Sequence, residues 1–493
     1  MSRNRILLVT AGIMLSLFLA SMESTVVATA MPTIVSELGG LEHYSWVFSA
    51  YMLASTTTVP LYGKLSDLYG RRKLYVGAMV LFLTGSILCG QAASMEGLIL
   101  ARGLQGIGAG GIMPLAFILI GEMFTLEQRA KMQGFFSGVW GVSSIAGPLL
   151  GGFLVDQLSW RWVFYINLPF GLLAAGLVGL AWRDQIHTHG RPAVDYAGSA
   201  LLTLSVVTLL LGLTVPLGSI NSWILIAAAF ILFALLLWAE NRAVDPILPL
   251  HLFRERLFTI AVTHGMLTGW AMFGSISFVP LFVQSVLMTS ATQAGITISP
   301  MLLGWVGASI IGTRLLLRVG YRRLAILGTS LLAVGAFLMS TAHADISQTQ
   351  IMVYVALMGI GMGLSIPGFL IAVQTTVERR YLGTATSTLQ FSRSIGGTLG
   401  VSVMGAALSA RLAANLRASG LDLGLISQLL NSVSETQATL NEAARIAVAN
   451  AINLVFVIAF VAALLGLIVT LFAPRQKLQD QPAQDEAVMI SAD

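Results

Sequence analysis

Apolar runs of membrane-crossing length alternate along this chain with short, polar and charge-rich connections. A helix that spans a bilayer needs about 20 mostly apolar residues, and fourteen stretches meet that need. They are residues 6–30, 44–63, 74–93, 97–120, 133–155, 162–182, 197–214, 222–239, 258–283, 294–313, 323–341, 350–373, 386–409 and 448–473. This pattern predicts an all-α polytopic membrane protein.

A faint internal repeat divides these predicted spans. The connection that contains Gly70 and Arg72 follows span two, and a similar one with Gly320 and Arg322 follows span ten, although Leu317 stands where the first copy has Asp67. Parallel halves around a central cavity are a known transporter plan. We expect two six-helix bundles and two extra central helices, in four regions: residues 1–183, 184–256, 257–475 and 476–493.

Two polar segments lie outside the predicted spans. Residues 410–447 form the longest predicted loop, and residues 425–433 within it have the pattern of a short amphipathic helix on the outer face. This loop is either a solvated hinge or a lip that guides lipophilic cargo. The segment 476–493 is polar, and we expect it to be disordered.

The placement of charge sets the predicted orientation. Of 27 Lys and Arg residues, 21 fall on one predicted side and 4 on the other, which places both termini in the cytoplasm under the positive-inside rule. The net charge of +5 therefore reflects topology and not nucleic-acid binding. The single cysteine, Cys89, excludes an internal disulfide and a cysteine metal site. We find no enzyme motif and no P-loop, so we expect neither catalysis nor use of ATP.

Three polar residues inside predicted spans are candidates for proton coupling. Glu23 is the acid deepest in any span, so it should face the bundle interior and titrate. Arg102 and Gln105 lie three residues apart in span four and share one helix face. Arg102 needs an acceptor and would pair with a nearby acid in one conformation and release it in another. The alternative is a permanent structural pair.

Two further patterns indicate helices that move. Charge is dense between spans two and three in a chain with only 10% charged residues, which suggests a latch. Its members are Gly63, Asp67, Gly70, Arg71 and Arg72. Span five has paired small residues and a kink-forming proline, which suit either a bendable seam or ordinary close packing. Its motif residues are Gly138, Gly147, Pro148, Gly151 and Gly152.

The remaining intramembrane polar and large apolar side chains are candidates for a substrate cavity. Arg393 is the second intramembrane base, and a soft lining of methionine and aromatic side chains suits varied cargo. For each of them, ordinary packing is the alternative. The candidates are Met22, Tyr51, Gln105, Trp140, His264, Phe273, Gln374, Gln390 and Arg393.

Taken together, these motifs resemble the major facilitator superfamily, specifically its fourteen-helix drug:proton antiporter branch. Residues 63–73 resemble the loop signature of the superfamily, and residues 98–111 and 138–152 resemble the motifs of spans four and five. Residues 160–169, 248–258 and 393–397 resemble signatures of the fourteen-helix branch. The first-span motif usually carries Asp where Glu23 stands here, which keeps the carboxylate on a longer arm.

The resemblance implies a proton-coupled exporter of amphipathic or lipophilic compounds that works by alternating access, powered by the proton gradient without a cofactor or metal. It further implies a bacterial cytoplasmic membrane and a monomer whose partners are substrate, protons and lipids. An exporter of lipids or another cell-made lipophile is an alternative in the same class. A non-transporting receptor or scaffold is the alternative from another class, and it would need neither Glu23 nor Arg102.

Overall fold

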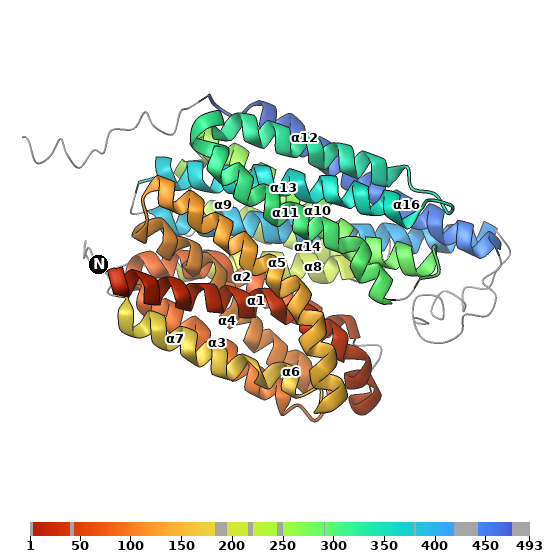
Figure 1. Cartoon of the computed structure of the whole chain (residues 1–493), viewed down its shortest axis with the longest axis horizontal. Helices are drawn as coiled ribbons and strands as arrows, with labels where there is room; N and C mark the ends of the chain where they lie inside the picture. Colours follow the sequence, from red (N-terminus) through yellow and green to blue (C-terminus); the bar gives the residue numbers. More distant parts are fainter. Residues whose placement is uncertain are drawn as a thin grey trace, which may run out of the picture.

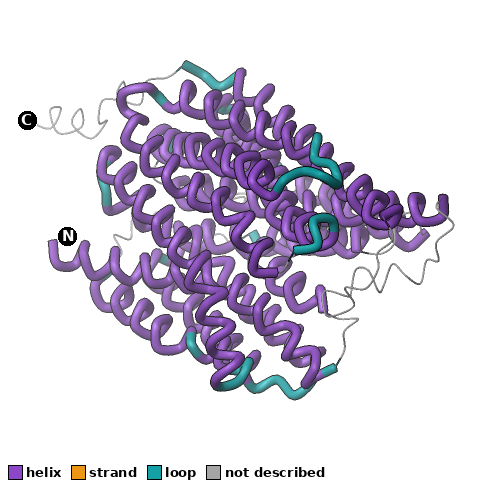
Figure 2. Tube along the Cα trace, turned by 45° about the vertical axis from the view of Figure 1, so that its right-hand side comes forward, coloured by secondary structure: helices purple, strands orange, loops and turns teal. Residues whose placement is uncertain are grey.

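The computed structural model describes residues 3–39, 44–182, 195–214, 220–243, 250–289, 291–378, 381–418 and 442–475. All regular structure within these ranges is helical, as Figure 2 shows. The predicted amphipathic helix at 425–433 and the segment 476–493 lie outside the described residues.

Fourteen described helices have 15 or more residues. The first six are α1 (Arg3–Leu38), α2 (Tyr44–Tyr69), α3 (Arg71–Gly90), α4 (Met95–Met123), α5 (Leu126–Gln157) and α7 (Asn167–Ala181), with the short α6 (Trp162–Tyr165) before α7. Two more are α8 (Tyr196–Thr214) and α9 (Ile220–Glu240). After the 3₁₀ helix η2 (Leu250–Arg254) come α10 (Arg256–Ser285), α11 (Ala291–Val319), α12 (Tyr321–Ser340), α13 (Gln348–Thr376), α14 (Leu382–Ala418) and α16 (Glu442–Leu471).

Each predicted span overlaps one of these helices, the sixth span covering α6 and α7 together. Ten of the described helices are long and apolar enough to cross a membrane. The predicted bounds of the loop 410–447 were wrong, because α14 continues to Ala418 and α16 begins at Glu442. Residues 410–418 are mostly Ala, Leu and Arg, which are strong helix formers, so the helix runs on past its apolar section.

Helix starts follow local capping chemistry. The hydroxyl of Ser94 accepts a hydrogen bond from the backbone N–H of Gly97 at the start of α4, and Thr125 begins α5 with a capping box. The same reciprocal arrangement opens α13 at Ser347. These side chains satisfy backbone N–H groups that have no partner within the helix, and so they fix where the long helices begin.

The repeat seen in the sequence reappears in the packing. In the first bundle α1 packs on α5 and α7, while α4 packs on α2 and α3. In the second bundle α10 packs on α14 and α16, while α13 packs on α11 and α12. Gly70 and Gly320 occupy the same turn in the two bundles, with φ of 90° and 85°. Positive φ is a region that glycine enters without steric cost, so these two turns need this residue.

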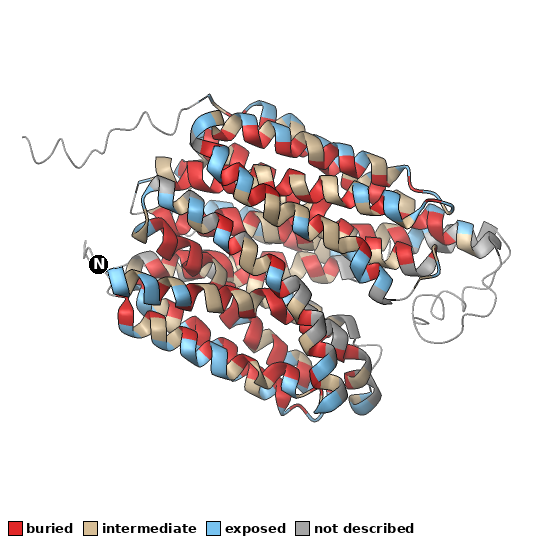
Figure 3. Ribbon diagram, viewed as in Figure 1, coloured by how far each residue is buried: buried red, intermediate tan, exposed pale blue. Residues whose placement is uncertain are grey.

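Helices α8 and α9 pair with each other and lie beside α2 and α14. Leu202, Val206 and Leu210 of α8 form an apolar cluster with Ile395 of α14. Buried residues line the inner helix faces throughout, and exposed residues follow the outer faces (Figure 3). The inserted pair therefore covers one side of the junction between the two bundles.

The two bundles meet most closely at one end. We call this the basic end, since α1 begins there and the basic turns at Arg71 and Arg322 lie there. Figure 1 shows the helices of the two bundles close together at that end, marked N, and diverging toward the other. Contacts of α2 and α4 with α14, and of α5 with α11, join the bundles.

Candidate functional site

Glu23 lies on the inner face of α1 and is 1% exposed. Its Oε1 accepts hydrogen bonds from Nη1 of Arg102 at 2.5 Å and from Nε2 of Gln105 at 3.0 Å. Its Oε2 accepts one from Nδ2 of Asn167 at 2.8 Å. The carboxylate is thus shielded from water and carries a donor on each oxygen. Burial makes a carboxylate charge costly, and the donors on both oxygens, Arg102 among them, offset that cost.

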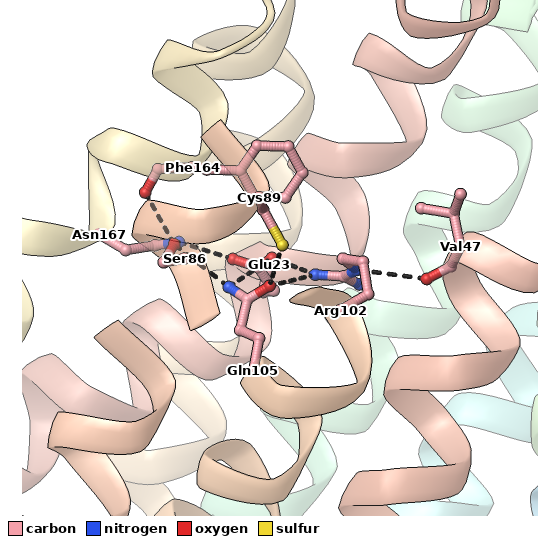
Figure 4. A network of polar contacts seen from close by, with 8 residues as sticks. All are labelled: Glu23, Val47, Ser86, Cys89, Arg102, Gln105, Phe164 and Asn167. Carbon is pink, nitrogen blue, oxygen red and sulfur yellow. Dashed lines mark hydrogen bonds and ion pairs between the residues drawn. The ribbon is translucent and has the colours of Figure 1, made fainter. Parts of the chain in front are cut away.

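Arg102 and Gln105 approach Glu23 together from α4, and Figure 4 shows this network. Nη1 of Arg102 also donates to Oε1 of Gln105 at 2.8 Å, which orients the amide so that its nitrogen faces Glu23. Nε of Arg102 donates to the carbonyl of Val47 at 3.2 Å, and the guanidinium lies 4.2 Å from the centroid of the Tyr51 ring. The shared helix face predicted for Arg102 and Gln105 is the face that meets Glu23.

Small residues let the helices around this network come close. A Cβ at Gly85 of α3 would lie 2.5 Å from the Cα of Gln105, and a Cβ at Gly106 would lie 2.5 Å from the carbonyl oxygen of Tyr51. Real Cβ atoms do not approach so closely, so α3 and α2 reach α4 only because glycine stands at these positions. Close backbones place the polar side chains within direct hydrogen-bonding distance.

Sequence reasoning assigned no role to Asn167, Ser86 or Cys89, which complete the network. Oγ of Ser86 donates to the carbonyl of Phe164 at 2.8 Å and accepts from Asn167 at 3.0 Å and Gln105 at 3.2 Å. The thiol of Cys89 lies 3.6 Å from Oε1 of Gln105. All three are fully buried. In the sequence, Asn167 and Ser86 are visible only as an amide and a hydroxyl within apolar runs. Residue type alone does not distinguish such a side chain in a polar network from one that packs in the core.

The predicted latch lies at the basic end. Nη1 of Arg71 donates to the carbonyl of Ser66 at 2.5 Å, and its Nη2 pairs with Glu122 of α4 at 2.8 Å. The side chain of Asp67 lies outside the described residues. Gly63 faces α14, where an added Cβ would lie 2.5 Å from the Cβ of Ser387. Contact between the bundles at this point therefore depends on Gly63, and the ion pair of Arg71 with Glu122 stays within the first bundle.

The span-five motif lies along α5, which faces α11. Trp140 packs on Trp305 of α11, with ring centroids 5.8 Å apart, and a Cβ at Gly141 would lie 2.9 Å from Val306. A Cβ at Gly138 would meet nothing within 4 Å. Gly147 and Gly151 are buried further along the helix. Pro148 and Gly152 also lie in α5, but their surroundings are outside the described part of the structure.

The substrate-cavity candidates do not form one group. Gln374 donates to the carbonyl of Phe117 at 3.5 Å, and Gln390 donates to the sulfur of Met113 at 3.4 Å, so both join the second bundle to α4. His264 lies within the second bundle, bonded to Thr470 at 2.9 Å and stacked near Phe369. Met22 packs in the apolar core beside Glu23.

Phe273 and Arg393 lie at the contact between α10 and α14. The ring of Phe273 faces Gly397, and Gly269 faces Arg393. Within the described ranges, no three His, Cys, Asp or Glu side chains gather in a way that could hold a metal ion. The polar chemistry of this part of the chain therefore centres on Glu23.

Comparison with known proteins settles the family. The sequence profile of the Major Facilitator Superfamily matches residues 13–401. The chain belongs to the major facilitator superfamily. It is 42% identical over 416 residues to the multidrug transporter protein MdtP of Bacillus subtilis (strain 168), covering 83% of this chain and 76% of that protein. It is 38% identical over 403 residues to multidrug resistance protein 3 of the same organism, covering 80% and 78%.

The superfamily fold extends to solved structures of low sequence identity. The proton:xylose symporter XylE aligns with a TM-score of 0.63 at 14% identity, covering 96% of this chain and 97% of that one. At that identity the likeness concerns the fold alone. The chain is therefore a multi-pass membrane transporter of this superfamily. The Glu23 network lies inside its first bundle.

Proposed function

We propose that this chain is a fourteen-span, proton-coupled exporter of amphipathic or lipophilic compounds, drugs among them, across a bacterial cytoplasmic membrane. The multidrug names of two relatives of 38% and 42% identity support the cargo class. The observation that carries the coupling is the burial of Glu23 against Arg102, Gln105 and Asn167. An ionisable residue inside a membrane span is costly and commonly marks a functional site.

In this conformation Arg102 takes its counter-charge from Glu23. Adding a proton to Glu23 would leave the Arg102 charge uncompensated inside the bundle, and an uncompensated buried charge costs about 3–5 kcal/mol. The proton therefore enters in an arrangement where Arg102 finds water or another acceptor. When Glu23 is protonated, the guanidinium of Arg102 keeps its hydrogen bond to the carbonyl of Val47 on α2 and its contact with the ring of Tyr51. Protonation is in this way tied to a movement of α1 and α4 relative to each other.

Coupling to cargo needs only that proton and cargo favour different states or compete for one site. The bundles are joined at the basic end by Gly63 against Ser387 and by Gln374 against Phe117. With both termini in the cytoplasm, this arrangement is the outward-facing state of an alternating-access cycle. Cargo would leave to the outside from it, and a proton would be taken up before the basic end opens.

The decisive experiment replaces Glu23 by Gln in proteoliposomes that hold an imposed pH gradient. Gln keeps the size and one acceptor but cannot exchange a proton. We expect gradient-driven uptake of a fluorescent amphipathic probe, tested once as a cation (rhodamine 6G) and once as an anion (carboxyfluorescein), to fall to the level of empty liposomes, with the thermal midpoint within a few degrees of wild type. The matched control is Glu255→Gln, an exposed glutamate before α10.

The two outcomes separate clearly. Retained gradient-driven transport in Glu23→Gln would remove the coupling role of this acid. Loss of transport in both variants would point to a defect in reconstitution, which ligand-free thermal unfolding of the same samples identifies. Wild-type protein that transports no lipophilic probe under any gradient would contradict the exporter proposal itself.

A further inference from the structure

Arg393 is an arginine inside the second bundle whose charge is not neutralised. Of the basic residues, only Arg102 and Arg393 fall in the interior of a predicted span, since Arg323 is the first residue of its span. Arg102 is 1% exposed and is paired with Glu23. Arg393 is partly buried, and among the described residues its guanidinium has neither a hydrogen-bond partner nor an ion-pair partner. A charge held deep between apolar helices is costly unless water or a counter-ion accompanies it.

Arg393 lies on α14, the helix through which the second bundle contacts α2 and α4 of the first. Gln390, three residues earlier on the same face of α14, contacts Met113 of α4 at 3.4 Å. Gly269 of α10 makes room for the side-chain stem, since a Cβ there would lie 3.2 Å from Cγ of Arg393. Arg393 lies ~16 Å along the helix axis from the start of α14, which is near the middle of a membrane-spanning segment. Along α14 it lies beyond Ser387, the residue that meets Gly63 of α2 at the basic end.

The helices around Arg393 offer no acid at this depth. The sequences of α10, α14 and α8 contain no Asp or Glu. Those of α2 and α4 contain acids only near their ends, at Asp67, Glu96 and Glu122. The deep acid of the first bundle, Glu23, is committed to Arg102, Gln105 and Asn167. The boundary therefore carries an unbalanced positive charge in this conformation.

Aromatic side chains border the same boundary. Phe273 lies one helical turn beyond Gly269 on α10 and faces Gly397, one turn beyond Arg393. At a separate contact between the bundles, that of α5 with α11, the tilted rings of Trp140 and Trp305 have centroids 5.8 Å apart. A guanidinium binds carboxylate or sulfonate oxygens through two parallel N–H donors, while aromatic rings suit the apolar part of the same molecule.

We propose that the preferred cargo is an amphipathic organic anion, with its acidic group on Arg393 and its apolar part toward Phe273. This inference rests on the proposed export function and narrows its substrate class. It opposes the expectation of cationic drugs that multidrug exporters commonly raise, because the sequences of α2, α4, α8, α10 and α14 place no acid at the depth of Arg393 to receive a cation. The anion supplies the counter-charge that the protein itself does not.

Equilibrium binding with two probes of one shape tests the charge preference. Radiolabelled 2-naphthylacetate and (2-naphthylmethyl)trimethylammonium share a ring system and carry opposite charges. With wild-type protein in nanodiscs, we expect the anion to bind at least about tenfold more tightly than the cation. Arg393→Gln should weaken anion binding by about tenfold or more, the range for losing a charge-assisted hydrogen bond, while Arg393→Lys should retain most of it.

Arg411→Gln is the control, because Arg411 is an exposed arginine on the same helix. Its anion affinity should equal that of wild type. Tighter binding of the cation, absence of anion binding to wild-type protein, or equal anion affinity in Arg393→Gln would each overturn the proposal. Binding is measured without a pH gradient, so a failure of proton coupling would leave this result standing, and a failure here would leave export of other cargo intact.

Discussion

The side-chain amide of Asn167 donates one hydrogen bond to Oε2 of Glu23 at 2.8 Å and another to Oγ of Ser86 at 3.0 Å. Both N–H groups of the amide are thereby used at a site with no exposure. Asn167 begins α7, directly after the turn that follows α6. It connects α7 to the proton-coupling candidate on α1 and to α3, so three helices are fixed relative to one carboxylate.

Replacing Asn167 by Ala should destabilise the first bundle. The change leaves Oε2 of Glu23 without this donor in a buried position, and such a loss costs about 1–3 kcal/mol. We expect a lower thermal midpoint in detergent and weaker gradient-driven transport. Asn241→Ala, at an exposed position just after α9, should leave both quantities near wild type. Equal midpoints for the two variants would show that the amide contributes nothing to the network.

Enlarging Gly63 should separate the bundles at the basic end. Even a Cβ would overlap Ser387 of α14 and come within 2.9 Å of the carbonyl of Gly383, and a leucine side chain needs more room still. Gly63→Leu should therefore favour conformations open at that end, since it destabilises this one selectively. The readout is the distance between spin labels on cysteines introduced at Lys73 and Arg323, both exposed at the basic end.

That distance should lengthen in Gly63→Leu and stay unchanged in Gly77→Leu. Gly77 of α3 is the matched control, because a Cβ there would meet nothing within 4 Å. Transport by Gly63→Leu should fall while that of Gly77→Leu persists. An unaltered distance in the Gly63 variant would mean that α14 yields locally and that this contact does not hold the two bundles together.

Glu37 gives the protein a defined response to acid at the end opposite the basic end. It lies beyond the predicted span 6–30 and accepts hydrogen bonds from Nε1 of Trp160 at 2.8 Å and from Arg161 at 3.1 Å. The Trp160 bond first, and then Arg161, lower the pKa of Glu37 below its usual 4.5. Stabilisation by such an acid is present above the pKa of the unfolded chain and is lost as the pH falls through the folded value.

Comparison with Glu37→Gln isolates this contribution. At pH 7 wild-type protein should unfold at a higher temperature than the variant, because only the wild type carries the charge that Arg161 pairs with. The difference should shrink as the pH falls below about 4.5 and should disappear at lower pH, where the carboxyl is protonated in both states. A difference that is constant between pH 7 and pH 3 would contradict the assignment.

Much of the fold was predictable, because a bilayer forces apolar residues into uninterrupted helices. Each apolar run became a helix, and the faint repeat of Gly70 and Gly320 reappeared as one packing scheme used twice. The ends of α14 and α16 were not predictable from hydropathy, since Ala-rich helices continue after the apolar section stops. Helix propensity and burial in the membrane are separate causes of helix formation, and the apolar pattern indicates only burial in the membrane.

The candidate site was predictable only in part. The spacing of Arg102 and Gln105 fixed their common face, and the isolation of Glu23 in an apolar run marked it as unusual. Asn167 and Ser86 were not found, because their place in the network depends on how α3 and α7 pack around α1. His264, which the sequence offered as a cavity residue, bonds to Thr470 within the second bundle. Which face of a helix packs against which neighbouring helix cannot be read from a single sequence.

The matching turns at Gly70 and Gly320 point to an ancestry that the residues around them have largely lost. Both turns have a glycine with positive φ, although Asp67 of the first copy corresponds to Leu317 in the second. The two halves thus share one backbone plan, while the buried pair of Glu23 and Arg102 lies in the first of them.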